Sequence, residues 1–180
     1  MKTRGQAAEE NFYRGYNCSQ AVLLAFADIL GMDEGALLSV SAPFGGGVGR
    51  TRHICGTLSG ALMAAGLLLY DPAQVTGEQK SALYARVQAL IARFRAENGS
   101  HICAELLAAA GVDPSAAPEA EARTPAYYKK RPCPALCRAA ADMLAAYLQE
   151  EGVLAADGSF TGKKPFAPAN EGNERGGHEQ

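Results

Sequence analysis

The five cysteines are the residues of this chain with the most readily stated chemistry, and none of them forms a CxxC pair. Thiolates attack disulfides and ligate metals. The first turn of a helix favours a thiolate, because its unpaired N–H groups carry partial positive charge. A cluster of thiols at helix starts would therefore be reactive. The five are Cys18, Cys55, Cys103, Cys133 and Cys137.

Local patterns predict that all five cysteines lie at or near the beginnings of helices. Cys18 follows Asn17, a strong N-cap with Gln three residues later. Cys55 begins an apolar helix directly after a glycine-rich loop. Cys133 is the predicted cap of the last helix, and Cys137 lies within its first turn. If these helix starts converge, they form one pocket that favours negative charge.

The glycine-rich loop at 44–50 (FGGGVGR) could belong to that pocket. Its spacing fits neither a dinucleotide fingerprint nor a P-loop, and no strand precedes it. It is therefore either a tight turn that lets the backbone pack closely or a nest of N–H groups beside the thiols. We expect cofactor contacts from Gly45, Gly46, Gly47 and Gly56.

Two histidines precede cysteines by two residues, His53 before Cys55 and His101 before Cys103. Each could be a ligand, a base for the neighbouring thiol or a solvated helix-start residue.

Composition excludes several function classes. A net charge of −2 leaves no basic stripe for nucleic acid. The N-terminus lacks an apolar signal sequence, and the longest apolar stretch is too short to span a membrane. We therefore expect a cytoplasmic protein that binds neither nucleic acid nor membrane, in a compartment where structural disulfides are rare.

Hydrophobic periodicity predicts an all-α fold, a single compact bundle of six or seven helices. Residues 1–152 form the predicted domain, and the polar segment 153–180 is a predicted mobile tail. Gly60 and Gly66 interrupt the apolar helix, so we expect close backbone contacts at both. The region 112–132 is a predicted loop. The expected helices are 6–14, 18–30, 33–40, 54–70, 77–98, 101–110 and 134–151.

Five sequence blocks together resemble the C_GCAxxG_C_C family of redox-active proteins of bacteria and archaea. The resemblance extends over about residues 11–150. One position departs from the family motif, because Thr57 stands where the family has Ala. The blocks are 15–22 (GYNCSQAV), 44–47 (FGGG), 55–63 (CGTLSGALM), Cys103 and 137–141 (CRAAA).

The resemblance implies that Cys18, Cys55, Cys103 and Cys137 are the four family cysteines, acting as redox thiols or metal ligands. Cys133 is then an additional thiol that could resolve a disulfide. A similar domain in split-Soret-type cytochromes is associated with a [2Fe–2S] cluster. The resemblance therefore makes cluster binding one option for this chain.

Three functions are consistent with these residues. The first is electron transfer through a [2Fe–2S] cluster, and the second is thiol–disulfide redox without metal. The third is a structural zinc site or a non-catalytic helical interaction module. The expected partner is an unidentified redox protein, and a homodimer is also consistent with the small-residue helix faces. The segment 127–131 (YYKKR) is either a docking site for an acidic partner or a solvated loop.

Overall fold

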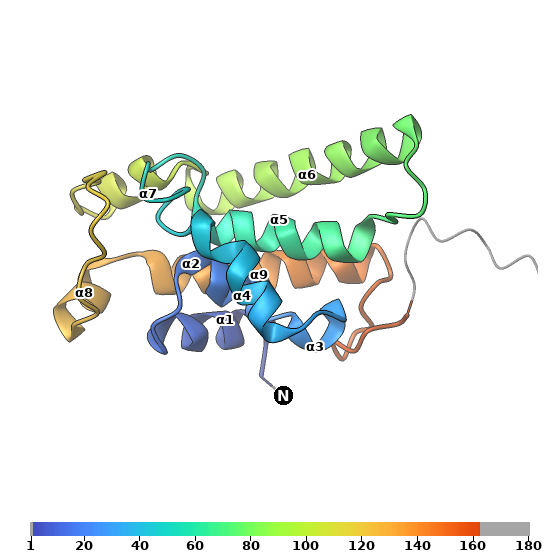
Figure 1. Cartoon of the computed structure of the whole chain (residues 1–180), viewed down its shortest axis with the longest axis horizontal. Coiled ribbons are helices and arrows are strands. Elements are labelled where there is room, and N and C mark those ends of the chain that lie inside the picture. The colour runs from blue at the N-terminus through green and yellow to red at the C-terminus, as the bar shows by residue number, and fades with distance from the viewer. Residues whose placement is uncertain (1, 163–180) are drawn as a thin grey trace, which may run out of the picture.

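The computed structural model describes residues 2–162, and within them the chain forms helices and turns without a β-sheet (Figure 1). The all-α prediction is confirmed for this part of the chain. A short 3₁₀ turn covers Ala42–Phe44. The helices are α1 (Arg4–Tyr13), α2 (Cys18–Leu24), α3 (Ala27–Leu30), α4 (Glu34–Ser41), α5 (Gly56–Leu69), α6 (Gly77–Asn98), α7 (Cys103–Ala109), α8 (Pro125–Lys130) and α9 (Cys133–Glu150).

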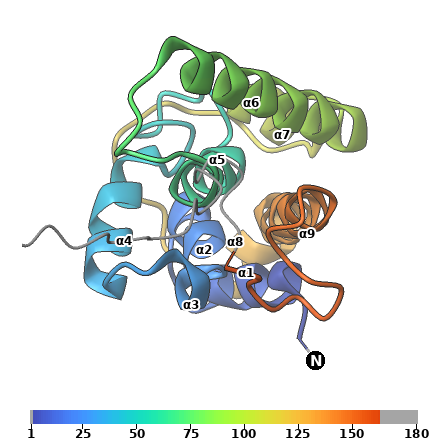
Figure 2. The same cartoon turned by 90° about the vertical axis from the view of Figure 1, so that its right-hand side faces the viewer.

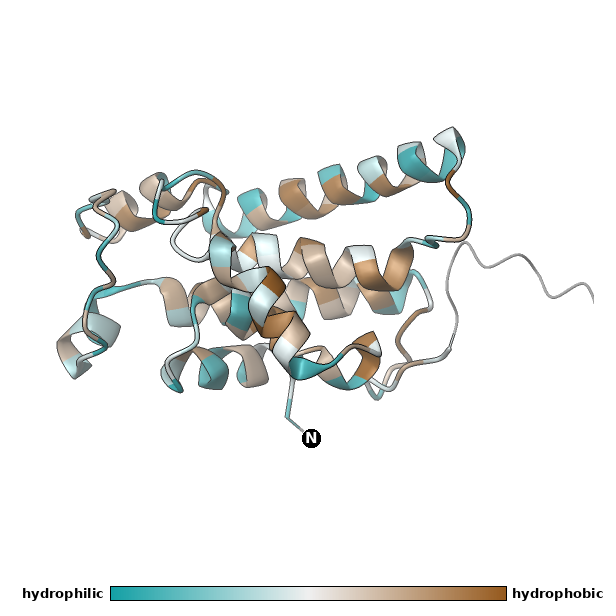
Figure 3. Cartoon of the chain, in the orientation of Figure 1, coloured by the Kyte–Doolittle hydropathy of each residue, from teal (hydrophilic) through white to brown (hydrophobic). Residues whose placement is uncertain are grey.

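The helices α5 and α9 form the centre of the bundle. Helix α9 packs against α1, α2, α5 and α6, while α2 packs against α1, α4 and α5 (Figure 2). Figure 3 shows that α5 is apolar along most of its length, whereas α6 alternates between apolar and polar residues. This difference follows from position, because α5 is covered by neighbours and α6 lies on the outside of the bundle.

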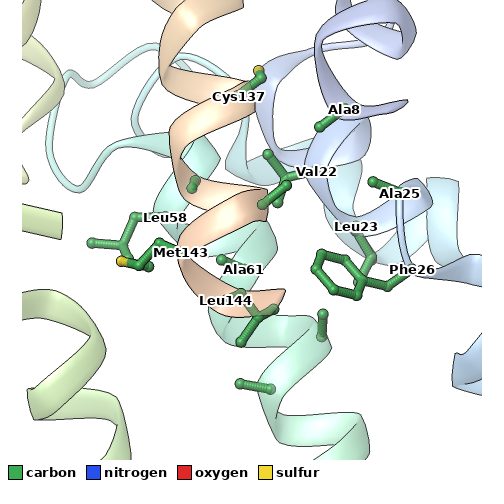
Figure 4. Close-up of a cluster of buried hydrophobic side chains, with 14 of the residues drawn as sticks. Ala8, Val22, Leu23, Ala25, Phe26, Leu58, Ala61, Cys137, Met143 and Leu144 are labelled. Carbon is green, nitrogen blue, oxygen red and sulfur yellow. The ribbon is translucent and has the colours of Figure 1, made fainter. Parts of the chain in front are cut away.

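The core is a cluster of fully buried side chains between α2, α5 and α9. Val22 of α2, Leu58 of α5 and Leu144 of α9 each have no exposed surface (Figure 4). Burial of such a side chain stabilises the fold by roughly 1.5–3 kcal/mol. The core therefore fixes the relative positions of the helices whose starts carry cysteines.

The predicted helix 18–30 is divided into α2 and α3 in the structure. The break lies at Phe26, whose backbone leaves helical geometry while its side chain is fully buried in the core. Arg4 of α1 donates a hydrogen bond to the carbonyl of Ala25 at 2.8 Å, which satisfies an acceptor at the break. A tertiary contact thus compensates for the interrupted helix.

The region 112–132 contains helix α8, which we did not predict. Thr124 accepts a hydrogen bond from the backbone N–H of Tyr127, and Pro125 occupies the first turn. Thr followed by Pro is a helix-start signal. The surrounding segment is rich in alanine and proline, a composition typical of loops, and this obscures the helix-start signal.

The chain remains packed beyond Gly152, where we had placed the start of the tail. Val153 and Leu154 are buried, and Leu154 forms a bridge with Phe160. The rest of the predicted tail, residues 163–180, lies outside the described residues. In the described part, no helix has the length and apolar character needed to cross a membrane.

The two glycines inside α5 have different surroundings. A Cβ atom on Gly60 would lie 2.5 Å from the carbonyl oxygen of Ser19, so glycine is what lets α2 approach α5. A Cβ atom on Gly66 would meet nothing within 4 Å. The expected close backbone contact is confirmed at Gly60 and is wrong at Gly66.

Candidate functional site

An isolated antiparallel β-bridge between two segments holds Cys55 and Cys103 close together. The segments pair at Ile54 and Ile102. The N–H of Cys55 donates to the carbonyl of His101 at 2.8 Å, and the N–H of Cys103 donates to the carbonyl of His53 at 2.6 Å. The starts of α5 and α7 are therefore adjacent, although the segments are far apart in the sequence.

The start of α2 is fixed against the glycine-rich loop. The Asn17 side chain accepts from the backbone N–H groups of Ser19 and Gln20, the predicted capping box, and donates to the carbonyl of Ala42 at 2.9 Å. This holds Cys18, the first residue of α2, against α5. A Cβ atom on Gly56 would lie 2.4 Å from the Cys18 Sγ atom.

These elements enclose a cavity of about 290 Å³. Four thiols from the starts of four different helices line it. The helix starts of this set therefore converge, which the sequence left as a condition. The lining thiols are Cys18, Cys55, Cys103 and Cys133.

Cys137 lies outside that lining and is buried in the core. It has no exposed surface and belongs to the same apolar cluster as Ala8 and Val22 (Figure 4). Its Sγ atom lies 3.9 Å from the carbonyl oxygen of Cys18. The structure places Cys133, which the sequence left as an additional thiol, in the lining of the cavity. Cys137 lies near the same sulfurs, since thiolates on Cys18, Cys133 and Cys55 would each raise its pKa.

Burial dominates the ionisation of these thiols. Desolvation raises the pKa of Cys18, Cys55 and Cys137, and it raises the pKa of Cys133 to about 12. Repulsion between neighbouring thiolates acts in the same direction. The expectation that helix starts would lower the pKa of these thiols is therefore wrong for the protein alone. In the absence of a bound cation, these raised pKa values keep Cys18, Cys55 and Cys133 neutral at physiological pH.

Several hydrogen-bond donors nevertheless face the sulfurs. The Thr57 hydroxyl lies 3.2 Å from the Cys55 Sγ atom, and this contact lowers the pKa of Cys55 against the larger effect of burial. The backbone N–H of Gly46 acts in the same way on Cys18. These groups would stabilise negative charge on the sulfurs if it were present.

The glycine-rich loop contributes to the site in two ways. Gly45 and Gly46 line the cavity. Gly47 has a φ of 72°, and a Cβ atom there would lie 2.6 Å from the Cβ atom of Cys103. Neither Gly47 nor Gly56 is among the lining residues, so both allow close packing against cysteines instead.

The loop ends in an unusual backbone conformation. Val48, Arg50 and Arg52 all have φ between 62° and 67°. Non-glycine residues in this region cost of order 1–3 kcal/mol each and occur often at functional sites. The backbone here is held by its surroundings, and it places two arginines at the cavity.

The two histidines do not line the cavity. The His53 ring contacts the Thr51 hydroxyl at 3.0 Å, and the His101 Nδ1 atom is buried without a hydrogen-bond partner. Their backbone carbonyls accept the hydrogen bonds from Cys103 and Cys55. The His–x–Cys spacing therefore reflects the bridge between the two segments.

Sequence reasoning missed the arginines of the site. The segment 127–131, interpreted as a docking or solvated loop, supplies two lining residues, Tyr127 and Arg131. The run Arg50-Thr51-Arg52 beside the glycine-rich loop was the available signal, because it places two cations next to a predicted anion nest. The arginines that line the cavity are Arg50, Arg52, Arg123 and Arg131.

Thiols make up the possible metal-ligand set that lines the cavity, apart from the Glu121 carboxylate. Among residues 2–162, no three Cys, His, Asp or Glu side chains are arranged to hold one metal ion. A [2Fe–2S] cluster divides four thiolates between two irons and does not need three ligands around one point. Four thiols around a cavity with inward N–H and O–H donors fit that group.

Comparison with protein families gives one match, over residues 16–147. The matching family is described as "Putative redox-active protein (C_GCAxxG_C_C)". No curated protein and no solved structure matches the chain.

Proposed function

The chain belongs to the C_GCAxxG_C_C family, and on this basis we propose that it is an electron-transfer protein whose four cavity thiols hold a [2Fe–2S] cluster. The proposal rests on one observation. Four thiols from four separate helix starts line the same cavity. In the proposal the ligands are Cys18, Cys55, Cys103 and Cys133.

The cavity provides what such a cluster needs from a protein. Thiolates bind the iron, and hydrogen bonds to the sulfurs tune its reduction potential. The Thr57 hydroxyl and the Gly46 N–H are two such donors. When bound, the cluster would supply one-electron chemistry. The protein would exclude water and hold the sulfurs in place.

The ionisation of the thiols also supports a metal over free-thiol chemistry. A buried neutral thiol is a poor nucleophile for disulfide exchange, because the thiolate is the reactive form. Iron compensates the negative charge that burial disfavours, so ligation drives deprotonation. The raised pKa of Cys18 and Cys55 is therefore compatible with a metal-bound state of these cysteines.

Anaerobic purification and reconstitution with iron and sulfide test the proposal. We expect a brown protein with two iron and two sulfide per chain. A colourless protein that retains no iron would reject it. If such a protein lost two thiols reversibly under a mild oxidant, thiol–disulfide redox would be the function instead.

A pair of variants tests which cysteine is the fourth ligand. We expect Cys133→Ala to lose iron on reconstitution, because it removes a cavity-lining thiol. We expect Cys137→Val to retain iron, because the Cys137 side chain lies in the apolar core. The readouts are iron content and visible absorbance, with circular dichroism to confirm folding. If Cys133→Ala retained iron and Cys137→Val lost it, the fourth ligand would be Cys137, as the family resemblance implies.

A further inference from the structure

Arginines form part of the lining of the cysteine cavity, here called the arginine wall, and the carboxylates of the described residues do not balance all of their charges. Four arginines and one glutamate line the cavity, although the whole chain has a net charge of −2. Glu121 pairs with both Arg131 and Arg50. Within the described part of the chain, no carboxylate pairs with Arg52 or Arg123.

The two unbalanced guanidinium groups also have unused hydrogen-bond donors. Arg52 is 5% exposed, and its Nε atom donates to the carbonyl of Ser115 at 2.8 Å. Its Nη2 atom is buried and has no partner. The Nη1 atom of Arg123 is likewise buried and without a partner. A buried charged donor without an acceptor is unfavourable, so an acceptor that reached these atoms would be bound favourably.

The surroundings of Arg123 hold it in position. Its guanidinium group lies 4.4 Å from the ring centroid of Phe12 and 4.8 Å from that of Tyr127. Both aromatic residues line the cavity. The arginine is thus fixed by stacking and by a hydrogen bond from its Nη2 atom to the carbonyl of Tyr16 at 3.4 Å, while its Nη1 atom has no partner.

We propose that the arginine wall of the cavity binds an oxyanion group, with Arg52 and Arg123 as its principal donors. Guanidinium groups match the planar or tetrahedral oxygen arrangement of carboxylate, sulfate and phosphate. This inference goes beyond the proposed function, since it concerns the arginines and not the thiols.

Calorimetric titration of the full-length, reduced, metal-free protein at low ionic strength tests the inference. The probes are inorganic phosphate and phenyl phosphate. We expect saturable binding of phosphate. Tighter binding of phenyl phosphate would indicate that the oxyanion belongs to a small organic molecule whose ring contacts Phe12 and Tyr127. If phenyl phosphate bound as tightly as inorganic phosphate or more weakly, the natural ligand would be a free oxyanion.

Variants assign the binding to the cavity. We expect Arg52→Gln and Arg123→Gln each to weaken binding roughly tenfold or more. Arg52→Lys retains the charge but loses the fork of donors, so it should fall between wild type and Arg52→Gln. Arg95→Gln, an exposed charge change on α6 outside the cavity, is the matched control and should bind as wild type does.

Two results would overturn the inference. One is the absence of saturable binding to the folded wild type. The other is an equal loss in Arg95→Gln and Arg52→Gln, which would show a general charge effect. If Arg52→Gln does not fold, Arg123→Gln decides the question. Iron content after reconstitution is measured separately on the wild type, so a failure of the cluster proposal and a failure of this one give different results.

Discussion

Neighbouring groups have opposite effects on the pKa of the Cys55 thiol. Burial raises the pKa of its thiol, and a thiolate on Cys18 would raise it further. The Thr57 hydroxyl, at 3.2 Å, is the largest of the influences that lower it. Thr57 is also the one departure from the family motif noted in the sequence. This residue therefore gives the chain a hydrogen bond to sulfur that alanine could not supply.

We expect Thr57→Val to lower the midpoint potential of the reconstituted protein by an amount on the order of tens of millivolts, because a hydrogen bond to sulfur stabilises the more negative, reduced state. Redox titration followed by visible absorbance measures the shift. Thr57→Ser keeps the hydroxyl and is the control. A shift of equal size in both variants would show that packing, not the hydrogen bond, sets the potential.

At the scale of elements, the site depends on how closely α2 and α5 approach each other. Cys18 begins α2, and Cys55 immediately precedes α5. The carbonyl of Ser19 lies where a side chain on Gly60 would have to be. Any residue larger than glycine at this position must separate the two helices. Gly66, further along α5, carries no such restriction.

Matched substitutions in α5 test this contact. We expect Gly60→Ala to destabilise the protein by about 1–3 kcal/mol, because the new Cβ atom overlaps the backbone of α2. Gly66→Ala should be neutral or stabilising by up to about 1 kcal/mol, since it removes a helix-interior glycine in open space. Urea denaturation gives both free energies of unfolding. Equal effects of the two substitutions would contradict the close packing of α2 on α5.

At the scale of the whole molecule, features that depend on neighbouring residues could be predicted from the sequence, whereas features that depend on tertiary contacts could not. The capping box at Asn17 and the full extent of α6 follow from neighbouring residues, so the sequence contained them. The break at Phe26 depends on a core contact that no local pattern encodes. In the same way, the placement of Cys133 at the cavity and Cys137 in the core depends on which face of α9 meets α1 and α2.

The pKa prediction failed for a related reason. The benefit of a helix start is local and visible in the sequence, whereas the cost of desolvation depends on the complete fold. Burial of Cys18 and Cys55 could not be deduced from their neighbours. The arginines of the cavity were missed because Arg123 and Arg131 reach it only through the return of the chain from α7 to α9.

The buried thiols predict how the stability of the metal-free protein depends on pH. Their pKa values are raised on folding, so above about 9 the unfolded chain loses protons that the folded chain retains. The thiols should therefore add no pH dependence to the free energy of unfolding below this pH, and their contribution should fall as pH rises toward 12. Each thiol contributes a slope of up to about 1.4 kcal/mol per pH unit.

Urea denaturation of the metal-free, reduced protein over this alkaline range measures the slope. Cys137→Val removes one buried titrating group and should make the slope shallower. A wild type and variant with the same slope would show that Cys137 does not stay protonated in the folded state.

The origin of the cavity thiols in distant segments determines the order of events during synthesis. Cys18 comes from the first part of the chain and Cys133 from the beginning of its last long helix. No segment shorter than 18–133 contains all four cavity thiols. Contacts between residues far apart in the sequence form late in folding. A nascent chain that ends before α9 exposes three of these thiols without the fourth. If the cavity thiols hold a cluster as proposed, iron loading would follow the synthesis of α9, and until then the thiols would depend on the reducing power of their surroundings.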